Sequence, residues 1–182
     1  MKYAYAVAIV LLLSITSASM AGEIEDITLR WIDATYSGNA DEARNMLSEA
    51  ELKKFHTLFC DVARAAERKG AFRAFARSTL PVLKSSKEAC NISPGELVKN
   101  IIITVVRQDR VKKILQGADR RYIGSVKDNE RILAIYEVTI SMKGETAKVT
   151  GLLPIVKENN SYKVGIPSEL IATFKGLKLH FK

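Results

Sequence analysis

The chain has 182 residues, the size of one domain, which leaves little room for a second. With 47% apolar residues, 26% charged residues and 4 prolines, its composition excludes a disordered chain, a collagen-like repeat and a scaffold held by disulfides alone. The formal charge of +8 marks a basic protein.

The first 21 residues follow the order of a secretory signal. Lys2 supplies a positive start, residues 3–13 form an apolar run, and small or polar residues close the segment. Ser19 and Ala21 offer small side chains to a signal peptidase, so we expect cleavage after Ala21 and a periplasmic or secreted protein. Retention of the segment as an anchor is the alternative. Cleavage removes Lys2 and leaves a single domain, residues 22–182, with a charge of +7.

Helical patterns follow from residue 23 to about residue 115. Residues 23–36 repeat apolar side chains at near-helical spacing, and Gly38 ends them. Three further helices begin with capping boxes, in which a capping side chain is followed three residues later by an acid. The pairs are Asn39 with Glu42, Ser48 with Glu51, and Ser93 with Glu96. The last pair opens a largely buried helix.

The helix after Ser48 has the clearest apolar stripe. It consists of Leu52, Phe55, Phe59, Val62 and Ala66. Gly70 either ends this helix or is tolerated inside it, because apolar residues continue at helical spacing to Leu80. Residues 84–93 are predicted to form a polar connector.

From residue 119 the apolar pattern changes to a period of two. Four extended runs cover residues 121–127, 130–142, 146–156 and 162–165. The turns between them are short and rich in Gly, Asn and Asp, so neighbouring runs are expected to pair as an antiparallel meander. Helices followed by such a sheet predict an α+β fold, in which the N-terminal helices pack on one face of a curved four-stranded sheet.

Four segments carry a resemblance to a known superfamily: Trp31–Asn39, 122–126, 134–140 and 162–164. With the order of helices and strands, they make residues 23–166 resemble a secreted bacterial member of the NTF2-like (cystatin-like α+β cone) superfamily. Residues 49–93 form a longer helical and basic region than the plain family pattern has. The resemblance implies a cone-shaped cavity between helices and sheet, and it fixes no function, because members include enzymes, assembly subunits and binding modules.

An apolar ligand cavity is one expectation from this resemblance. Its predicted lining consists of Trp31, Tyr36, Phe55, Phe59, Tyr136 and Ile140. Members similar to steroid isomerases need a Tyr and a carboxylic acid in this cavity. Tyr136 is on the covered face, but Glu137 alternates outward and no acid can be placed inside. We therefore predict no catalytic residue, and a plain core role for Tyr136 is the alternative to a catalytic one.

Two cysteines, Cys60 and Cys90, are the only ones in the chain. In an oxidising compartment they predict a disulfide, with two buried free thiols as the alternative and one reactive nucleophile as a third possibility. His56 and His180 are the only histidines and lack metal-ligand spacing, so no metal site and no cofactor are expected.

Basic residues are the one feature beyond the fold that invites a function. Lys69, Arg73 and Arg77 recur every four residues, so on a continuous helix they would form one ridge, just after Arg64 and Arg68. A second cluster surrounds the junction between helices and sheet. It contains Arg107, Arg110, Lys112, Lys113, Arg120 and Arg121. A solvated face that keeps the protein soluble is the alternative to a binding surface.

These patterns favour an exported, non-enzymatic module that holds an apolar ligand in its cone or an anionic partner on its basic surface. The partner would be a protein or an anionic envelope component. Nucleic acid is not expected, because the basic clusters lack interleaved aromatic residues. A subunit of a secretion or conjugation assembly and a cavity enzyme of the isomerase or dehydratase type are the alternatives, and homo-oligomerisation stays open.

Overall fold

The computed structural model describes the backbone of residues 2–106, 114–115, 117–142 and 145–181, and side chains from residue 20 onward. Its helices are α1 (Lys2–Ser37), α2 (Ala40–Asn45), α3 (Glu49–Arg68), α4 (Phe72–Thr79), α5 (Ser86–Asn91), α6 (Pro94–Val106) and α8 (Ser168–His180). Its strands are β1 (Asp119–Asp128), β2 (Arg131–Met142), β3 (Glu145–Glu158) and β4 (Ser161–Val164). The fold is α+β, as predicted.

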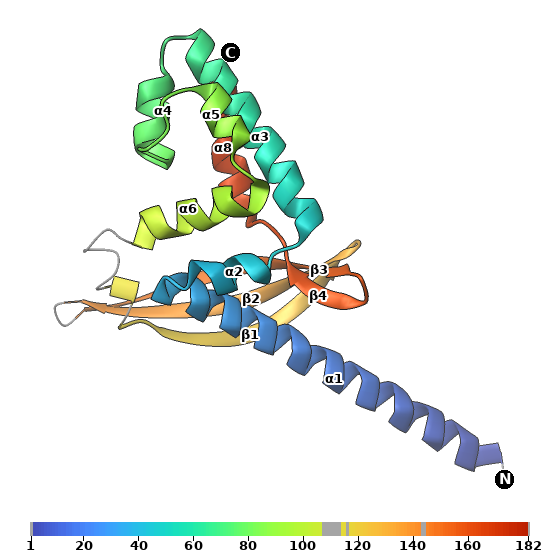
Figure 1. The fold of residues 1–182 in the computed structure, drawn as a ribbon. Helices are drawn as coiled ribbons and strands as arrows, with labels where there is room; N and C mark the ends of the chain where they lie inside the picture. The colour runs from blue at the N-terminus through green and yellow to red at the C-terminus, as the bar shows by residue number, and fades with distance from the viewer. Residues whose placement is uncertain (1, 107–113, 116, 143–144, 182) are drawn as a thin grey trace.

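A four-stranded antiparallel meander forms the sheet, in the order β1-β2-β3-β4. The predicted pairing of neighbouring strands is therefore confirmed. A register shift between Tyr122 and Gly124 interrupts the β1–β2 ladder. Asn159 and Asn160 both have positive φ, 50° and 63°, which is the backbone of a tight two-residue turn between β3 and β4. Figure 1 shows that the sheet is curved and does not close.

Helix α1 runs along the sheet, and its N-terminal part extends beyond the sheet to a free end (Figure 1). The sequence pattern predicted a helix only over residues 23–36, whereas the structure continues it without a break through the expected cleavage point after Ala21. Cleavage itself stays a prediction. In the part of the chain that the structure describes, no helix is both long and apolar enough to cross a membrane.

Local capping signals set the helix starts as the sequence predicted. The Asn39, Ser48 and Ser93 side chains each accept a hydrogen bond from the backbone N–H of the acid three residues later, at 3.3 to 3.4 Å. A capping side chain satisfies a backbone N–H that has no partner inside the helix, and each cap contributes about 1 kcal/mol. Ser85 caps α5 in the same way. The prediction of a polar connector over residues 84–93 was wrong at this point, because it missed that cap.

Gly70 ends α3. Its φ of +68° is a left-handed conformation that favours glycine, so the chain turns at residues 69–71 and begins α4 in a new direction. A continuous ridge of Lys69, Arg73 and Arg77 therefore does not exist. The long apolar stripe of α3 is confirmed, and every member of it is at most 2% exposed.

The junction between α2 and α3 joins the edge of the sheet. Leu47 forms an isolated parallel β-bridge with Val164 of β4. The Ser48 N–H donates to the Val164 carbonyl, and the Val164 N–H donates to the Met46 carbonyl, both at 2.9 Å. Since α3 begins at this junction and α8 begins just after β4, the two helices leave the sheet from nearly the same place.

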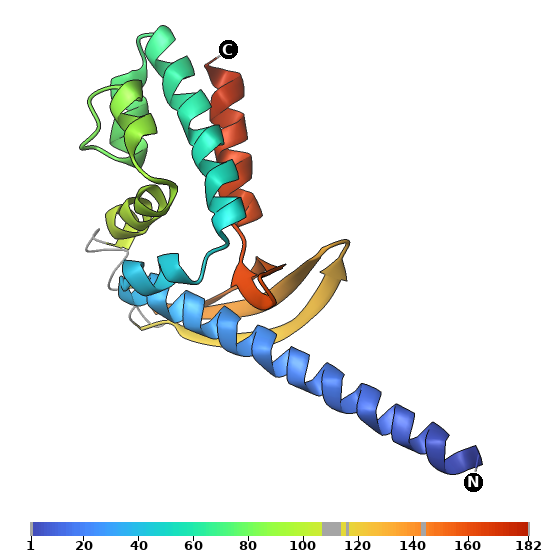
Figure 2. The same cartoon turned by 45° about the vertical axis from the view of Figure 1, so that its right-hand side comes forward.

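Helix α8, which sequence analysis missed, lies beside α3 along its length (Figure 2). Phe174 of α8 is 3% exposed. Its ring centroid lies 5.1 Å from that of Phe55, 5.6 Å from Phe59 and 6.4 Å from Phe75. Lys178, one turn further on, pairs with Asp61 at 2.7 Å. These four phenylalanines form the aromatic core of the helical layer.

We expect Phe174→Ala to lower the free energy of unfolding by about 3–5 kcal/mol, because it removes a ring from the centre of this aromatic core. Leu179→Ala, on the same helix, is the matched control. Leu179 is 67% exposed, so its truncation should change stability by no more than about 0.5 kcal/mol. Urea unfolding of both variants measures the difference. Equal effects would show that α8 does not pack on α3.

Candidate functional site

The six residues predicted to line one cavity come from α1, α3 and β2, and five of them, all but Ile140, belong to or pack against one continuous hydrophobic core. Phe55 and Phe59 are 2% and 0% exposed in the aromatic core of the helical layer. Trp31 and Tyr36 are on α1, and Tyr136 and Ile140 are on β2. The rings of Phe55 and Phe59 both pack on Phe174, and the Phe59 ring also packs on Phe75.

Tyr36 and Tyr136 are half-buried between α1 and the sheet, together with Arg120. The Arg120 guanidinium lies 5.1 Å from the centre of the Tyr36 ring. Burial raises the pKa of Tyr36, and the charge of Arg120 opposes this effect. Burial, with smaller contributions from Tyr36 and the Glu169 carboxylate, raises the pKa of Tyr136 to about 12. Both hydroxyls are therefore protonated at neutral pH.

A close approach of the chain to the Tyr136 ring fixes its position. Gly151 is opposite Tyr136 in the β2–β3 ladder. A Cβ at Gly151 would lie 2.3 Å from Cζ of the ring, so only glycine leaves room for the ring in this place.

Among the described residues, no hydrogen-bonded acid-and-tyrosine pair of the isomerase type is found, although the Glu169 carboxylate is near enough to Tyr136 to raise its pKa. In the described part of the chain, no carboxylate makes a hydrogen bond to the Tyr136 hydroxyl. The nearby acid Asp33 is paired with Arg120 at 2.7 Å and is directed to an exposed position. The Glu137 side chain points away from the tyrosines, as the alternation along the strand predicted. Its carboxylate forms ion pairs with Arg121 at 3.1 Å and Lys148 at 3.2 Å.

The two cysteines lie close to one another at the contact between α3 and α5, as free thiols and without a bond between them. Sγ of Cys60 is 3.8 Å from Nε2 of His56. Burial, and then the hydrogen bond with Cys90, raise the pKa of the Cys60 thiol to about 12. A protonated thiol is a poor nucleophile, so Cys60 is not activated for catalysis. Among the described residues, no cluster of His, Cys, Asp and Glu could hold a metal ion.

The predicted basic residues divide into two groups at the Gly70 turn. Arg64, Arg68 and Lys69 line a cleft of about 430 Å³ between the ends of α3 and α8. Arg73 and Arg77 line a second cleft, of about 720 Å³, with the loop after α4. Arg107, Arg110, Lys112 and Lys113 lie outside the described residues. Arg120 and Arg121 are each paired with an acid, so they do not form a free basic surface.

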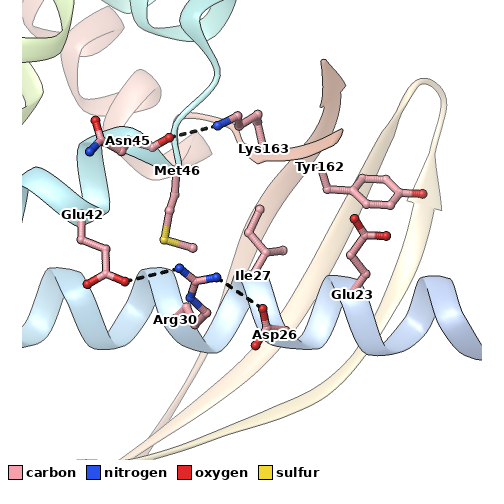
Figure 3. A pocket seen from close by; sticks show the side chains of 9 residues that line it. All are labelled: Glu23, Asp26, Ile27, Arg30, Glu42, Asn45, Met46, Tyr162 and Lys163. Carbon is pink, nitrogen blue, oxygen red and sulfur yellow. Dashed lines mark hydrogen bonds and ion pairs between the residues drawn. The ribbon is translucent and has the colours of Figure 1, made fainter. Parts of the chain in front are cut away.

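One cleft on the side of α1 was missed by sequence analysis (Figure 3). Its volume is about 580 Å³, and both acidic and basic side chains line it. Arg30 bridges Asp26 at 3.7 Å and Glu42 at 3.5 Å. Lys163 donates to the Asn45 carbonyl at 3.0 Å. The cations of this cleft are therefore engaged by the protein's own oxygens.

Comparison of the chain with protein-family models, curated proteins and solved structures found no match. The geometry of these sites is therefore the only basis for a function.

We expect Tyr136→Phe to change the stability of the protein at alkaline pH. The Tyr136 pKa is raised from about 10 in the unfolded chain to about 12 in the fold. The resulting stability is fully present below about pH 10 and is lost as the pH rises through about 12, because the unfolded chain ionises first. Wild-type protein should therefore lose more unfolding free energy between about pH 9 and about pH 11 than the variant. Urea unfolding at both pH values measures this, and equal losses would contradict it.

Proposed function

We propose that the chain is an exported, non-enzymatic binding module of NTF2-like type that holds an anionic partner on the basic end of its helical layer. The basic end is defined by Arg64, Arg68, Lys69, Arg73 and Arg77. The partner we propose is an anionic component of the cell envelope, such as a phospholipid head group.

One observation carries this proposal: no described acid forms an ion pair with any of the five cations. Glu67, the acid nearest to them in sequence, is engaged elsewhere. The backbone N–H and the hydroxyl of Ser86 both donate to its carboxylate, and they lower the Glu67 pKa. Elsewhere in the described chain, nine basic residues form ion pairs with acids. Unneutralised cations on one end of a protein create a field that attracts anions.

Two apolar side chains, one exposed and one half-buried, accompany these cations. Val82 is 75% exposed and lines the cleft of Arg73 and Arg77, together with Lys84. Phe181 lines the cleft of Arg64 and Arg68. Apolar side chains surrounded by cations are typical of surfaces that touch lipid head groups. A solvated face that only keeps the protein soluble has no need of them.

Membership of the NTF2-like superfamily is part of the proposal. Its support is the order of the elements: helices first, then a curved antiparallel meander with α1 running along it. The structure gives less support to an apolar ligand in the predicted cavity than to an anionic partner, because Phe55 and Phe59 are buried by other side chains.

Charge reversal tests the proposed surface. We expect Arg64→Glu with Arg68→Glu to weaken binding to phosphatidylglycerol vesicles by roughly 30-fold or more, because each cation near an anionic membrane contributes about 1 kcal/mol. Cosedimentation measures the binding, with phosphatidylcholine vesicles as the uncharged reference. Added salt should also weaken it.

A double variant with the same charge change, Lys53→Glu with Lys175→Glu, is the matched control and should bind phosphatidylglycerol vesicles like the wild type, because both lysines are exposed and lie outside the basic end. Equal binding by all three proteins, or binding that salt does not change, would refute the proposed surface.

Export also predicts a bond between Cys60 and Cys90. In an oxidising compartment the two thiols would pass two electrons and two protons to a thiol oxidant, and closure of the loop of about thirty residues would stabilise the fold by about 3–4 kcal/mol. Intact mass measured before and after reduction tests this, because the bonded form is two hydrogens lighter. Alkylation of both cysteines in denatured, unreduced protein from that compartment would contradict it.

A further inference from the structure

A second cleft shares Tyr162 with the cleft of Figure 3. It measures about 440 Å³, which is within the size range of small-molecule sites. It opens where α1 leaves the sheet, at the ends of the β1–β2 and β3–β4 hairpins. Its lining is Met20, Ser125, Lys127, Glu130, Arg131, Ile132, Ile155, Lys157 and Tyr162.

Strand register sorts these side chains into an apolar floor and a cationic rim. Lys127, Ile132 and Ile155 are paired in one row across three strands, and Lys157 is paired with Tyr162 in the next row. Paired residues face the same side of a sheet. Each row therefore places a lysine at the edge of an apolar surface. Ile155 is 0% exposed, so the floor is continuous with the hydrophobic core.

The rim cations differ in their availability. Arg131 is held 3.4 Å from the Glu51 carboxylate, whose side chain is only 6% exposed. Lys127 and Lys157 have no ion-pair partner in the part of the chain that the structure describes. Glu130 is the only acid among the lining residues of this cleft. The rim therefore carries an excess of positive charge beside the apolar floor.

The cleft of Figure 3 also contains Tyr162, but its lining is rich in acids instead of free cations. Glu23, Asp26 and Glu42 line it, and its two cations already contact protein oxygens. An anion would be repelled from the cleft of Figure 3 and attracted to the cleft at the hairpin ends.

We propose that the cleft at the hairpin ends binds an amphiphile with one aliphatic chain and an anionic head group. The chain lies over the half-buried Ile132 and Tyr162, with the buried Ile155 beneath them, and the head group meets Lys127 and Lys157. Burial of the chain supplies affinity, and the lysines select the charge and fix the orientation. Met20 covers the cleft from α1 but precedes the expected cleavage point, so the floor and the rim remain if residues 1–21 are removed.

Dodecanoate is the probe, and the full-length chain is titrated with it by calorimetry. We expect Lys157→Glu to weaken dodecanoate binding by roughly tenfold or more, because a rim cation becomes an anion. Lys87→Glu changes the total charge equally at an exposed position on α5, so it should bind like the wild type. Tyr162→Ala should also weaken binding, with circular dichroism to check that it folds.

Dodecanol, which has the same chain length but no charge, separates the contribution of the aliphatic chain from that of the anionic head group. It should bind at least tenfold more weakly than dodecanoate to the wild type. The proposal would be overturned if dodecanoate and dodecanol bound the wild type equally well. It would also be overturned if wild type and Lys157→Glu bound dodecanoate equally well. That second result would indicate that dodecanoate binds elsewhere, as on the apolar run of residues 3–13.

This site is independent of the proposed function, because none of its residues belongs to the basic end of the helical layer. Arg64→Glu with Arg68→Glu should leave dodecanoate affinity unchanged. Failure of vesicle binding and failure of dodecanoate binding are therefore separate results.

Discussion

Two backbone hydrogen bonds, from Ser48 to Val164 and from Val164 to Met46, set the architecture of this molecule. They hold the start of α3 at the end of β4, where the chain also turns toward α8. Two helices that leave the sheet from one place can lie side by side, so Phe174 meets Phe55 and Phe59. Together with the contacts of α6 with α1 and α2 and of α8 with β3, this junction holds the helical layer over the sheet.

Charge is distributed by this architecture as well as by sequence. The acids of α1 line one cleft beside Tyr162, and lysines from the hairpin ends line the other. Several other cations pair with the protein's own acids: Lys178 meets Asp61, Arg120 meets Asp33, and Arg131 meets the buried Glu51. At the basic end and at the cleft of the hairpin ends, no ion pair between described residues competes with an anionic partner for Arg64, Arg68, Lys127 or Lys157.

The candidate sites were less predictable than the fold. Alternation along β2 correctly placed Tyr136 on a covered face, but nothing local indicates that Phe55 and Phe59 face other phenylalanines instead of that tyrosine. The spacing of Lys69, Arg73 and Arg77 indicated a ridge, and one glycine with positive φ removed it. The cleft at the hairpin ends needs residues from α1 and all four strands or their turns, so no single stretch of sequence carries a signal for it.

The sequence by itself determined the features that depend on near neighbours along the chain. These are the caps at Asn39, Ser48 and Ser93, the apolar stripe of α3, and the alternation and tight turns that make the meander. Only the tertiary structure decided the position of α8 on α3 and the pairing of Met46–Ser48 with β4. Capping and periodicity act over a few residues, whereas these contacts join segments more than a hundred residues apart, where packing, not local preference, selects the partner.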